Sequence, residues 1–326
     1  MIKKKRAVKL EAVNLSLCSL CNADCMYCPS DRGGEIKEKI MPFSIVKKII
    51  GEISSEKFKK YHDVKIMSVS QNGEALLHPE IINILHFIKI KLPHIKINFF
   101  SNLGVLTEKK SETIVKEHLI DNLFCSVDAS NSQNCFYIND LDFKKIKHNL
   151  RVFITFRNKV KQFIPITLYI ITLYSYIHTI YNNFGFYPFK MQDKNLINVK
   201  NDYLIIKERY KKMLSRNDRI VKPAISAWAE RARINTNNLN YSKYNCPVLN
   251  RIKKEAFIAP NGDWYACCLD AKNKLLLGNI TKKTINKIFF SKRRAQLIEL
   301  LENKQFHKIG GPCKTVNCCG WFTQVE

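Results

Sequence analysis

Three cysteines near the amino end of the chain are spaced in a way that suits a metal cluster. Cys21, Cys25 and Cys28 form the pattern Cys-x3-Cys-x2-Cys. Three thiolates on one short loop can bind three irons of a [4Fe–4S] cubane and leave the fourth iron without a protein ligand. Such an open iron is a place where a small molecule can bind. The spacing therefore predicts a cluster that takes part in chemistry.

Zinc is the alternative interpretation of the same segment. Cys18 and Cys21 form one Cys-x2-Cys pair, and Cys25 and Cys28 form a second, so four thiolates are available for a structural zinc site. In the cluster interpretation Cys18 is instead a small buried residue at the end of a strand, because a fourth thiolate would close the open iron. A zinc site would leave the motifs further along the chain unexplained.

This segment resembles the radical S-adenosylmethionine (radical SAM) superfamily. The superfamily motif has the same cysteine spacing and usually an aromatic residue before the last cysteine, which here is Tyr27. The resemblance implies that the open iron binds the amino and carboxylate groups of S-adenosylmethionine (SAM). One electron from the cluster would then cleave SAM and give a 5′-deoxyadenosyl radical that abstracts hydrogen from a substrate.

Motifs after the next predicted strands agree with this resemblance. Asn72, Gly73 and Glu74 look like the family's Gly-Gly-Glu-Pro loop, which holds the amino group of SAM, although Asn72 replaces the first Gly. Glu74 can accept a hydrogen bond from the ammonium group, and Gly73 lets the backbone approach closely. The other predicted cofactor contacts lie at strand ends and are Ser101, Asn102, Ser126, Asp128, Thr172 and Gln192.

Six cysteines near the carboxyl end resemble the SPASM modules, and the shorter twitch modules, that follow radical SAM domains and bind auxiliary iron–sulfur clusters. The segment Ala259–Trp264 reads as the hairpin of such a module. The resemblance implies one auxiliary [4Fe–4S] cluster rather than two, because the six cysteines include two adjacent pairs. The expected ligands are Cys246, Cys267, Cys313 and Cys319, with Cys318 as the alternative to Cys319.

Four protein ligands would leave the auxiliary cluster without an open iron, which favours electron transfer or a structural task. Zinc is the alternative metal for this module. Cys268 is a spare thiol in this assignment. It is either a bystander or a catalytic group that returns a hydrogen atom to a substrate radical, as an epimerase requires.

Short apolar runs alternate with amphipathic segments between residues 10 and 192, which predicts repeated βα units. Helices over Pro42–Ile53 and Pro79–Lys91 have their apolar residues at a helical period. The six expected strands are Glu11–Leu17, Val64–Ser70, Ile95–Phe100, Leu123–Val127, Ile166–Thr172 and Phe186–Met191.

Six such units predict an α/β fold, a partial (β/α)6 TIM-like barrel with its active face at the carboxyl ends of the strands, followed by a small carboxy-terminal SPASM/twitch-like domain. The expected domains are the barrel over residues 1–200, a helical linker over residues 201–245 and the auxiliary cluster domain over residues 246–326.

Composition bounds the location and the partners. The chain has 54 Lys and Arg against 28 Asp and Glu, a formal net charge of +26. This charge favours anionic partners, but the basic residues are scattered, so nucleic acid is the less favoured partner. No run approaches the roughly 20 apolar residues of a membrane span. We expect a cytoplasmic protein with no membrane contact, whose twelve cysteines are not a disulfide framework.

The resemblance implies a radical SAM oxidoreductase or epimerase that acts on a small molecule, such as a sugar, an aminocyclitol or a natural-product intermediate. Its expected partner is a low-potential electron donor such as flavodoxin or ferredoxin. The alternatives are a peptide-maturing enzyme, an RNA-modifying enzyme motivated by the net charge, and a noncatalytic zinc module.

Overall fold

A curved sheet organises the chain in this computed structural model, which describes residues 8–28, 39–70, 72–160, 163–172, 175, 201–222, 245–270 and 274–314. Its strands in this part of the chain are β1 (Ala12–Leu15), β2 (Ile66–Val69), β3 (Lys96–Ser101), β4 (Asn122–Ser126), β5 (Ile166–Tyr169), β6 (Arg219–Val221), β7 (Glu255–Ile258), β8 (Asp263–Tyr265) and β9 (Leu276–Asn279). They follow the order β6-β5-β4-β3-β2-β1-β7-β8-β9. Neighbouring strands from β6 to β7 are parallel, whereas β8 and β9 are antiparallel to their neighbours.

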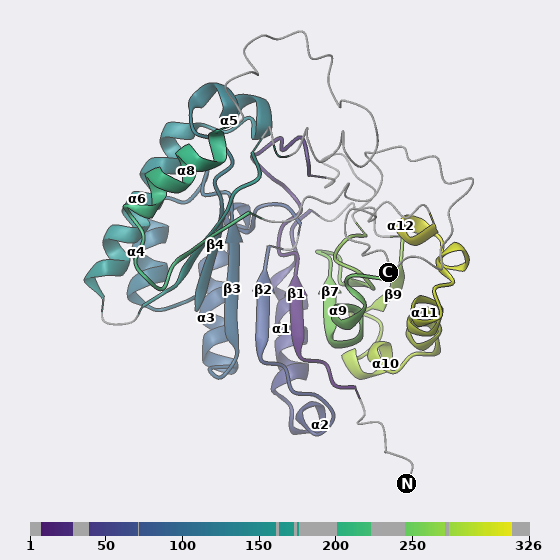
Figure 1. Ribbon diagram of the computed structural model, residues 1–326. Helices are drawn as coiled ribbons and strands as arrows, with labels where there is room; N and C mark the ends of the chain where they lie inside the picture. The colour runs from purple at the N-terminus through teal and green to yellow at the C-terminus, as the bar shows by residue number, and fades with distance from the viewer. Residues whose placement is uncertain are drawn as a thin grey trace.

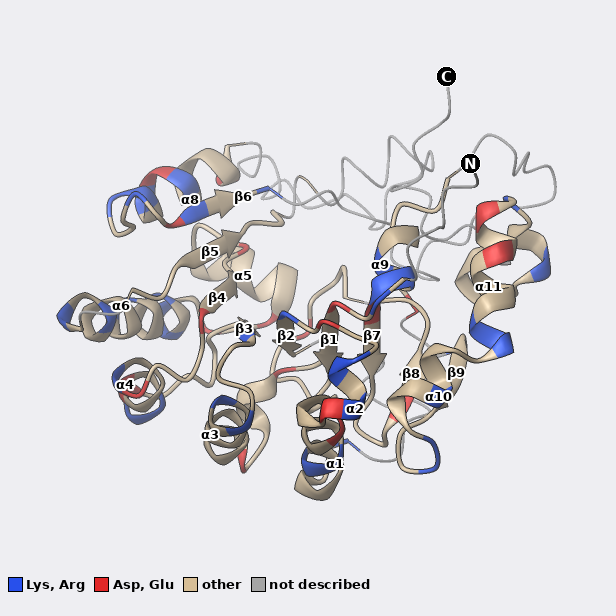
Figure 2. Cartoon of the chain, turned by 90° about the horizontal axis from the view of Figure 1, so that it is seen from below, with Lys and Arg blue, Asp and Glu red and all other residues tan. Residues whose placement is uncertain are grey.

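Helices cover one face of this sheet. The helices α1 (Phe43–Ser54), α3 (Ile81–Lys91), α4 (Glu108–Lys116) and α6 (Phe143–Lys159) form a row along that face, with α2 (Glu56–Lys59) after α1 (Figure 2). Strand residues alternate accordingly. In β3, Ile97 and Phe99 are buried, while Asn98 and Phe100, which alternate with them, are half-buried on the other face. No helix in the described ranges is long and apolar enough to cross a membrane.

The remaining helices lie at the two sides of the sheet. The helices α5 (Ser132–Asn139) and α8 (Asp202–Lys211) lie near α6, and α9 (Leu249–Lys254) leads into β7 (Figure 1). The helices α10 (Ile285–Phe289), α11 (Lys292–Glu302) and α12 (Gly311–Lys314) complete the carboxy-terminal part, together with the short 3-10 helix η4 (Phe306–Lys308). This part packs on the first helices, since the Ile285 N–H donates to Glu52 Oε2 at 2.7 Å.

The expected fold class, an α/β partial barrel followed by a small carboxy-terminal part, is confirmed. Five of the six predicted strands appear as β1 to β5, and α3 buries the four predicted apolar residues, Ile81, Ile84, Leu85 and Ile88. The sixth predicted strand, Phe186–Met191, lies outside the described residues. The expected linker, residues 201–245, contains α8 but also β6, which continues the barrel sheet beside β5.

An ion pair fixes β6 to β5. Arg157 lies near the end of α6, and its Nη1 donates to both carboxylate oxygens of Asp218, at 2.8 and 2.9 Å. Both side chains are fully buried. Asp218 Oδ1 also accepts the Ile166 N–H at 2.8 Å, at the start of β5. A buried carboxylate with these partners holds the last parallel strand in place.

Candidate functional site

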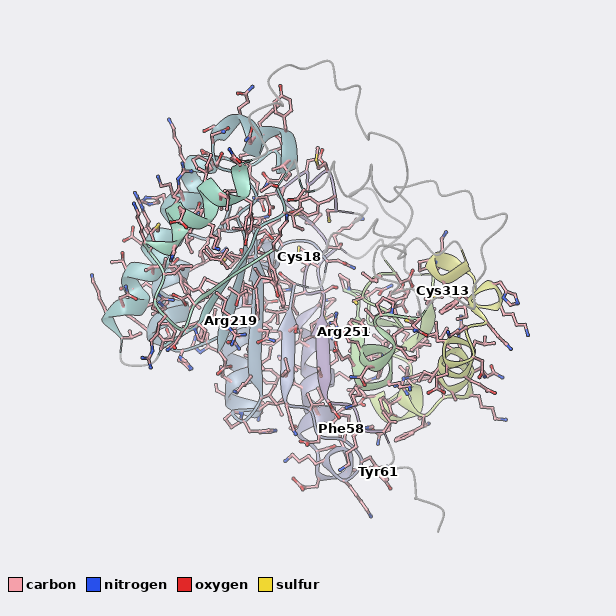
Figure 3. The ribbon with its side chains drawn as sticks, in the orientation of Figure 1. Cys18, Phe58, Tyr61, Arg219, Arg251 and Cys313 are labelled. Carbon is pink, nitrogen blue, oxygen red and sulfur yellow. The ribbon has the colours of Figure 1, made fainter. Side chains whose placement is uncertain are left out.

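The cysteine loop begins where β1 ends, at the carboxyl edge of the parallel strands. Cys18 is fully buried there, as expected for a residue that is not a cluster ligand (Figure 3). Cys21, Cys25 and Cys28 are each partly exposed. The loop turns tightly at its end, because the Cys28 N–H donates to the Cys25 carbonyl at 3.0 Å.

Two neighbouring elements hold this loop. The N–H groups of Asp24 and Met26 donate to the carbonyls of Asn139 and Ile138, at 2.7 and 2.9 Å, so the end of α5 supports the segment between the cysteines. On the other side, Asn102 Nδ2 lies 3.0 Å from Asn22 Oδ1 and 3.6 Å from Cys21 Sγ. The loop is therefore fixed by the strand-end segments that follow β3 and β4.

The three predicted ligands lie on one loop, where the pKa of the Cys25 thiol is strongly perturbed. Burial raises the pKa of the Cys25 thiol well above its ordinary value, and the negative charges of Asp128, Cys28 and Cys21 raise it further. Thiolates that repel one another in this way are stabilised by binding a metal cluster. In the described part of the chain no three potential ligands are arranged to share one metal ion. Cubane ligands each bind a separate iron and do not need that arrangement.

Glu74 is the buried acid of the site. Its Oε1 accepts the Leu76 N–H at 3.1 Å, and its Oε2 accepts the Asn102 N–H at 2.8 Å and the Ser101 hydroxyl at 3.2 Å. Burial raises the pKa of this carboxyl to about 7, against the opposing effect of those donors. The structure thus brings together three predicted cofactor contacts: Glu74, Ser101 and Asn102.

Gly73 brings the Glu74 loop against the cysteine loop. Its φ is +76°, and a Cβ there would lie 2.4 Å from the Cys18 carbonyl oxygen and 2.7 Å from that of Leu20. The next residue confirms the contact, because the Glu74 N–H donates to the Leu20 carbonyl at 2.8 Å. Only a residue without a side chain allows this approach.

Asp128 has a different environment from the one expected of a cofactor contact. Its Oδ2 accepts the Tyr27 hydroxyl at 2.5 Å, and its Oδ1 accepts the Ile171 N–H at 3.0 Å. Burial raises the pKa of this carboxyl to about 6, while the Tyr27 hydrogen bond acts in the opposite direction. Asp128 therefore ties the cysteine loop to the ends of β4 and β5.

The remaining predicted contacts are less closely grouped. Ser126 is half-buried at the end of β4. Thr172 is buried, and its hydroxyl bonds to Ser175 Oγ at 2.9 Å, so it serves the local loop. Gln192 lies outside the described residues. Asn72 lines a narrow cavity together with Ser16, Tyr265, Cys267 and Cys268. This cavity lies between the Glu74 loop and the carboxy-terminal module.

The cysteines of the carboxy-terminal module also come together. Burial and the negative charge of Cys246 raise the pKa of Cys313, and Cys268 has the same effect on Cys246. The hydrogen bond with Cys268, together with burial, raises the pKa of the Cys267 thiol well above its ordinary value, and the charge of Cys313 raises it further. Cys318 and Cys319 fall beyond the described residues. The charges of the four described cysteines therefore influence one another, which places them in the same part of the module.

Arg251 is a residue of this region that sequence reasoning missed. It binds Glu255 through Nε and Nη2, both at 2.9 Å, and its Nη1 lies 3.2 Å from Cys268 Sγ (Figure 3). Glu255 Oε2 also accepts from Asn14 Nδ2 at 3.0 Å, which links the pair to β1. The i, i+4 spacing of Arg251 and Glu255 predicts an ion pair between these two side chains. It does not predict the contact of Arg251 with Cys268.

Three aromatic rings on the helix-free face of the sheet were also missed. The rings of Phe100 and Phe124 stack with centroids 4.6 Å apart, and Tyr169 follows at 5.9 Å. Burial raises the pKa of the Tyr169 hydroxyl, and the Arg251 guanidinium opposes this rise, so both groups border the same side of the sheet. Phe100, Phe124 and Tyr169 alternate with the buried residues of β3, β4 and β5, and this alternation could have predicted that they share one face.

Comparison with known proteins agrees with this architecture. A family model described as SPASM, an iron-sulfur cluster-binding domain, matches residues 246–319. That range begins at Cys246 and includes all six cysteines of the carboxy-terminal cluster. No curated protein sequence matches the chain.

Solved structures with the same fold include BtrN in complex with AdoMet and 2-DOIA, which is 16% identical over 94% of this chain and 92% of that chain, with a TM-score of 0.51. Histidine-tagged anSMEcpe with bound AdoMet is 15% identical over 96% of this chain and 86% of that chain, with a TM-score of 0.58. Streptococcus suis SuiB bound to precursor peptide SuiA is 13% identical over 87% of this chain and 65% of that chain, with a TM-score of 0.55.

The fold, the cysteine loop and the matched domain define the class: a partial α/β barrel with a carboxy-terminal iron–sulfur module. Within it, residues 246–319 match a SPASM domain, and the chain shares its fold with AdoMet-bound BtrN and anSMEcpe. The match to an iron-sulfur cluster-binding domain supports an iron–sulfur cluster in the carboxy-terminal part of the chain.

Proposed function

We propose that this chain uses a cluster on Cys21, Cys25 and Cys28, together with SAM, to abstract hydrogen from a small molecule. The observation that carries this proposal is the buried Glu74 carboxyl beside the cysteine loop. Burial raises its pKa to about 7, so a further cation placed beside it would favour the ionised carboxylate. The ammonium group of SAM supplies that charge and can donate a hydrogen bond to the carboxylate.

The protein's own residues have defined tasks in this proposal. When bound, the cluster and SAM supply the one-electron chemistry that yields the 5′-deoxyadenosyl radical. Glu74 holds the ammonium group, and Ser101 and Asn102 fix the Glu74 carboxylate. Tyr27 and Asp128 fix the cysteine loop, while Asn72, Ser126, Thr172 and Gln192 are retained as proposed cofactor contacts.

The auxiliary site is proposed to hold a second [4Fe–4S] cluster. Its ligands are Cys246, Cys267, Cys313 and Cys319, with Cys318 as the alternative to Cys319. The cluster of described thiols supports this assignment. An electron donor such as flavodoxin or ferredoxin would reduce the first cluster.

For the substrate we propose a sugar, an aminocyclitol or a natural-product intermediate that is oxidised or epimerised. BtrN, which was crystallised with 2-DOIA, matches this chain over nearly its whole length. The stacked rings of Phe100, Phe124 and Tyr169 offer an apolar surface on the helix-free face of the sheet, where a small substrate is proposed to bind. Peptide maturation is the second candidate, since SuiB was crystallised with a precursor peptide and shares the fold.

Anaerobic reconstitution of the full chain tests the first cluster. With SAM and dithionite we expect 5′-deoxyadenosine and about eight irons per chain, four for each cubane. Cys25→Ala should remove about four irons and abolish 5′-deoxyadenosine. Cys18→Ala is the matched control and should retain both, because the buried Cys18 side chain is not one of the proposed ligands. Zinc in place of iron, or equal losses in the two variants, would refute the proposal.

A panel of deuterated sugars, aminocyclitols and peptides tests the substrate class. We expect deuterium to transfer into 5′-deoxyadenosine from a small molecule. Transfer from peptides alone would favour peptide maturation, and transfer from RNA would favour an RNA-modifying enzyme.

A further inference from the structure

A second cavity lies away from the cysteine loops, between the start of α5 and the helices α6 and α8. Its volume is about 550 Å³, which is within the usual range of small-molecule sites. The residues that line it are Ser130, Asn131, Ser132, Phe143, Lys144, Lys147, His148, Arg151 and Arg209. None of these described lining residues is acidic.

The basic side chains of α6 lie on one stripe of the helix. Lys144, Lys147, His148 and Arg151 follow at three- and four-residue steps, so they are neighbours on one face. The opposite face buries Leu150 and Phe153 among other apolar residues. Like charges at these steps repel one another, and this repulsion is relieved by an anion that binds among them. Lys and Arg also colour α6 and α8 in Figure 2.

Arg209 closes the cavity from α8. Its Nη1 donates to the Ser130 carbonyl, and its guanidinium carbon lies 5.5 Å from the centroid of the Phe143 ring. These contacts hold a half-buried guanidinium at the cavity instead of leaving it to extend into solvent. The acidic residues near the starts of α6 and α8 have hydrogen-bond partners: Asp142 accepts the Lys144 N–H, and Asp202 accepts from Asn134.

The remaining lining groups are suited to a tetrahedral oxyanion. Ser130 and Ser132 contribute hydroxyl groups, and α5 begins at Ser132 with Asn131 as its cap, so the first turn of the helix adds backbone N–H groups at the rim. Guanidinium, ammonium and hydroxyl donors around the start of a helix are the groups that bind phosphate in proteins.

We infer that this cavity binds a small molecule carrying one or two phosphate groups, at a site separate from the proposed radical chemistry. The cavity volume favours a compact ligand over a nucleic-acid strand, which needs an extended basic track. The ligand would contact the segment between Asp128 and α5. Asp128 and the end of α5 also hydrogen-bond to the cysteine loop.

Calorimetric titration of the full chain with inorganic pyrophosphate, at constant ionic strength in chloride, tests this inference. We expect saturable binding of one pyrophosphate, tighter than that of inorganic phosphate. Lys147→Gln and Arg151→Gln should each weaken it about tenfold, the usual effect of removing one charge-assisted hydrogen bond. Lys145→Gln is the matched control. It removes the same charge from the same helix outside the cavity, and should change the affinity less than about twofold.

Hydrogen exchange gives a second readout that does not depend on the variants. Pyrophosphate should slow exchange in residues 130–151 and leave α10 and α11 unchanged. Equal weakening by Lys145→Gln and Lys147→Gln would show that binding follows net charge alone and would overturn the inference. Absence of saturable binding would also overturn it, as would single-stranded RNA that binds more tightly with increasing length and displaces pyrophosphate.

Discussion

The Glu74→Gln substitution gives the sharpest physical test of the site. Burial raises the pKa of Glu74 from its ordinary value of 4.5 to about 7. The folded chain therefore binds a proton at Glu74 more tightly than the unfolded chain does. Between these two pKa values, the free energy of unfolding falls as pH rises. The rise in pKa corresponds to a loss of about 3 kcal/mol in the free energy of unfolding. This loss is complete above pH 7 and absent below about pH 4.5.

The glutamine side chain would carry no charge, so the substitution should remove this pH dependence. Its amide also places an N–H group against one of the existing donors, which lowers stability at every pH by about 1–3 kcal/mol. The informative quantity is therefore the change in the substitution's effect between pH 5 and pH 8, about 2–3 kcal/mol in favour of the variant at pH 8.

Anaerobic denaturant unfolding of the metal-free, reduced chain measures this quantity. The control is Glu108→Gln, which removes an exposed carboxylate at the start of α4 and should leave the pH dependence nearly unchanged. If Glu74→Gln and wild type lose stability in parallel between pH 5 and pH 8, Glu74 is not the buried acid described above. Addition of SAM to the reconstituted protein should stabilise wild type and have a smaller effect on the variant.

Three further predictions concern other parts of the structure. Gly73→Ala should lower 5′-deoxyadenosine formation more than about tenfold, because its Cβ would collide with the cysteine-loop backbone, whereas Gly51→Ala has open space and should be neutral. Arg157→Leu should lower the free energy of unfolding by about 3–5 kcal/mol by leaving Asp218 buried without its partner, and a loss below about 1 kcal/mol in denaturant unfolding would contradict this. Cys268→Ala should keep the iron content but stop solvent deuterium from entering the product; unchanged labelling would make Cys268 a bystander.

The sequence predicted the parts of the fold that repeat locally. Strands β1 to β5 were found because apolar residues alternate with short turns, and α3 was found from its helical period. The strand β6 was missed because three residues, Arg219–Val221, carry too little periodicity. Its pairing depends on the buried contact between Arg157 and Asp218, residues far apart in the chain.

The same distinction holds for the site. Glu74, Ser101 and Asn102 were predicted from motifs at neighbouring strand ends, and parallel pairing of β2 with β3 brings them together. The contact of Arg251 with Cys268 was not predictable, because it depends on how α9 packs against the segment after β8. Asp128 was expected at the cofactor, but only the folded chain shows that it binds Tyr27.

The pairing of β1 with β7 has a consequence for how the chain is made. Ala12 pairs with Glu255 and Leu15 with Ile258, in the strand that leads into the cysteine loop. During synthesis β1 can pair with β2 early, but its other edge stays unpaired until residues near 258 have emerged. An unpaired inner strand invites association with other chains. Folding of this chain should therefore be slow and late, and chains that stop before β7 should aggregate.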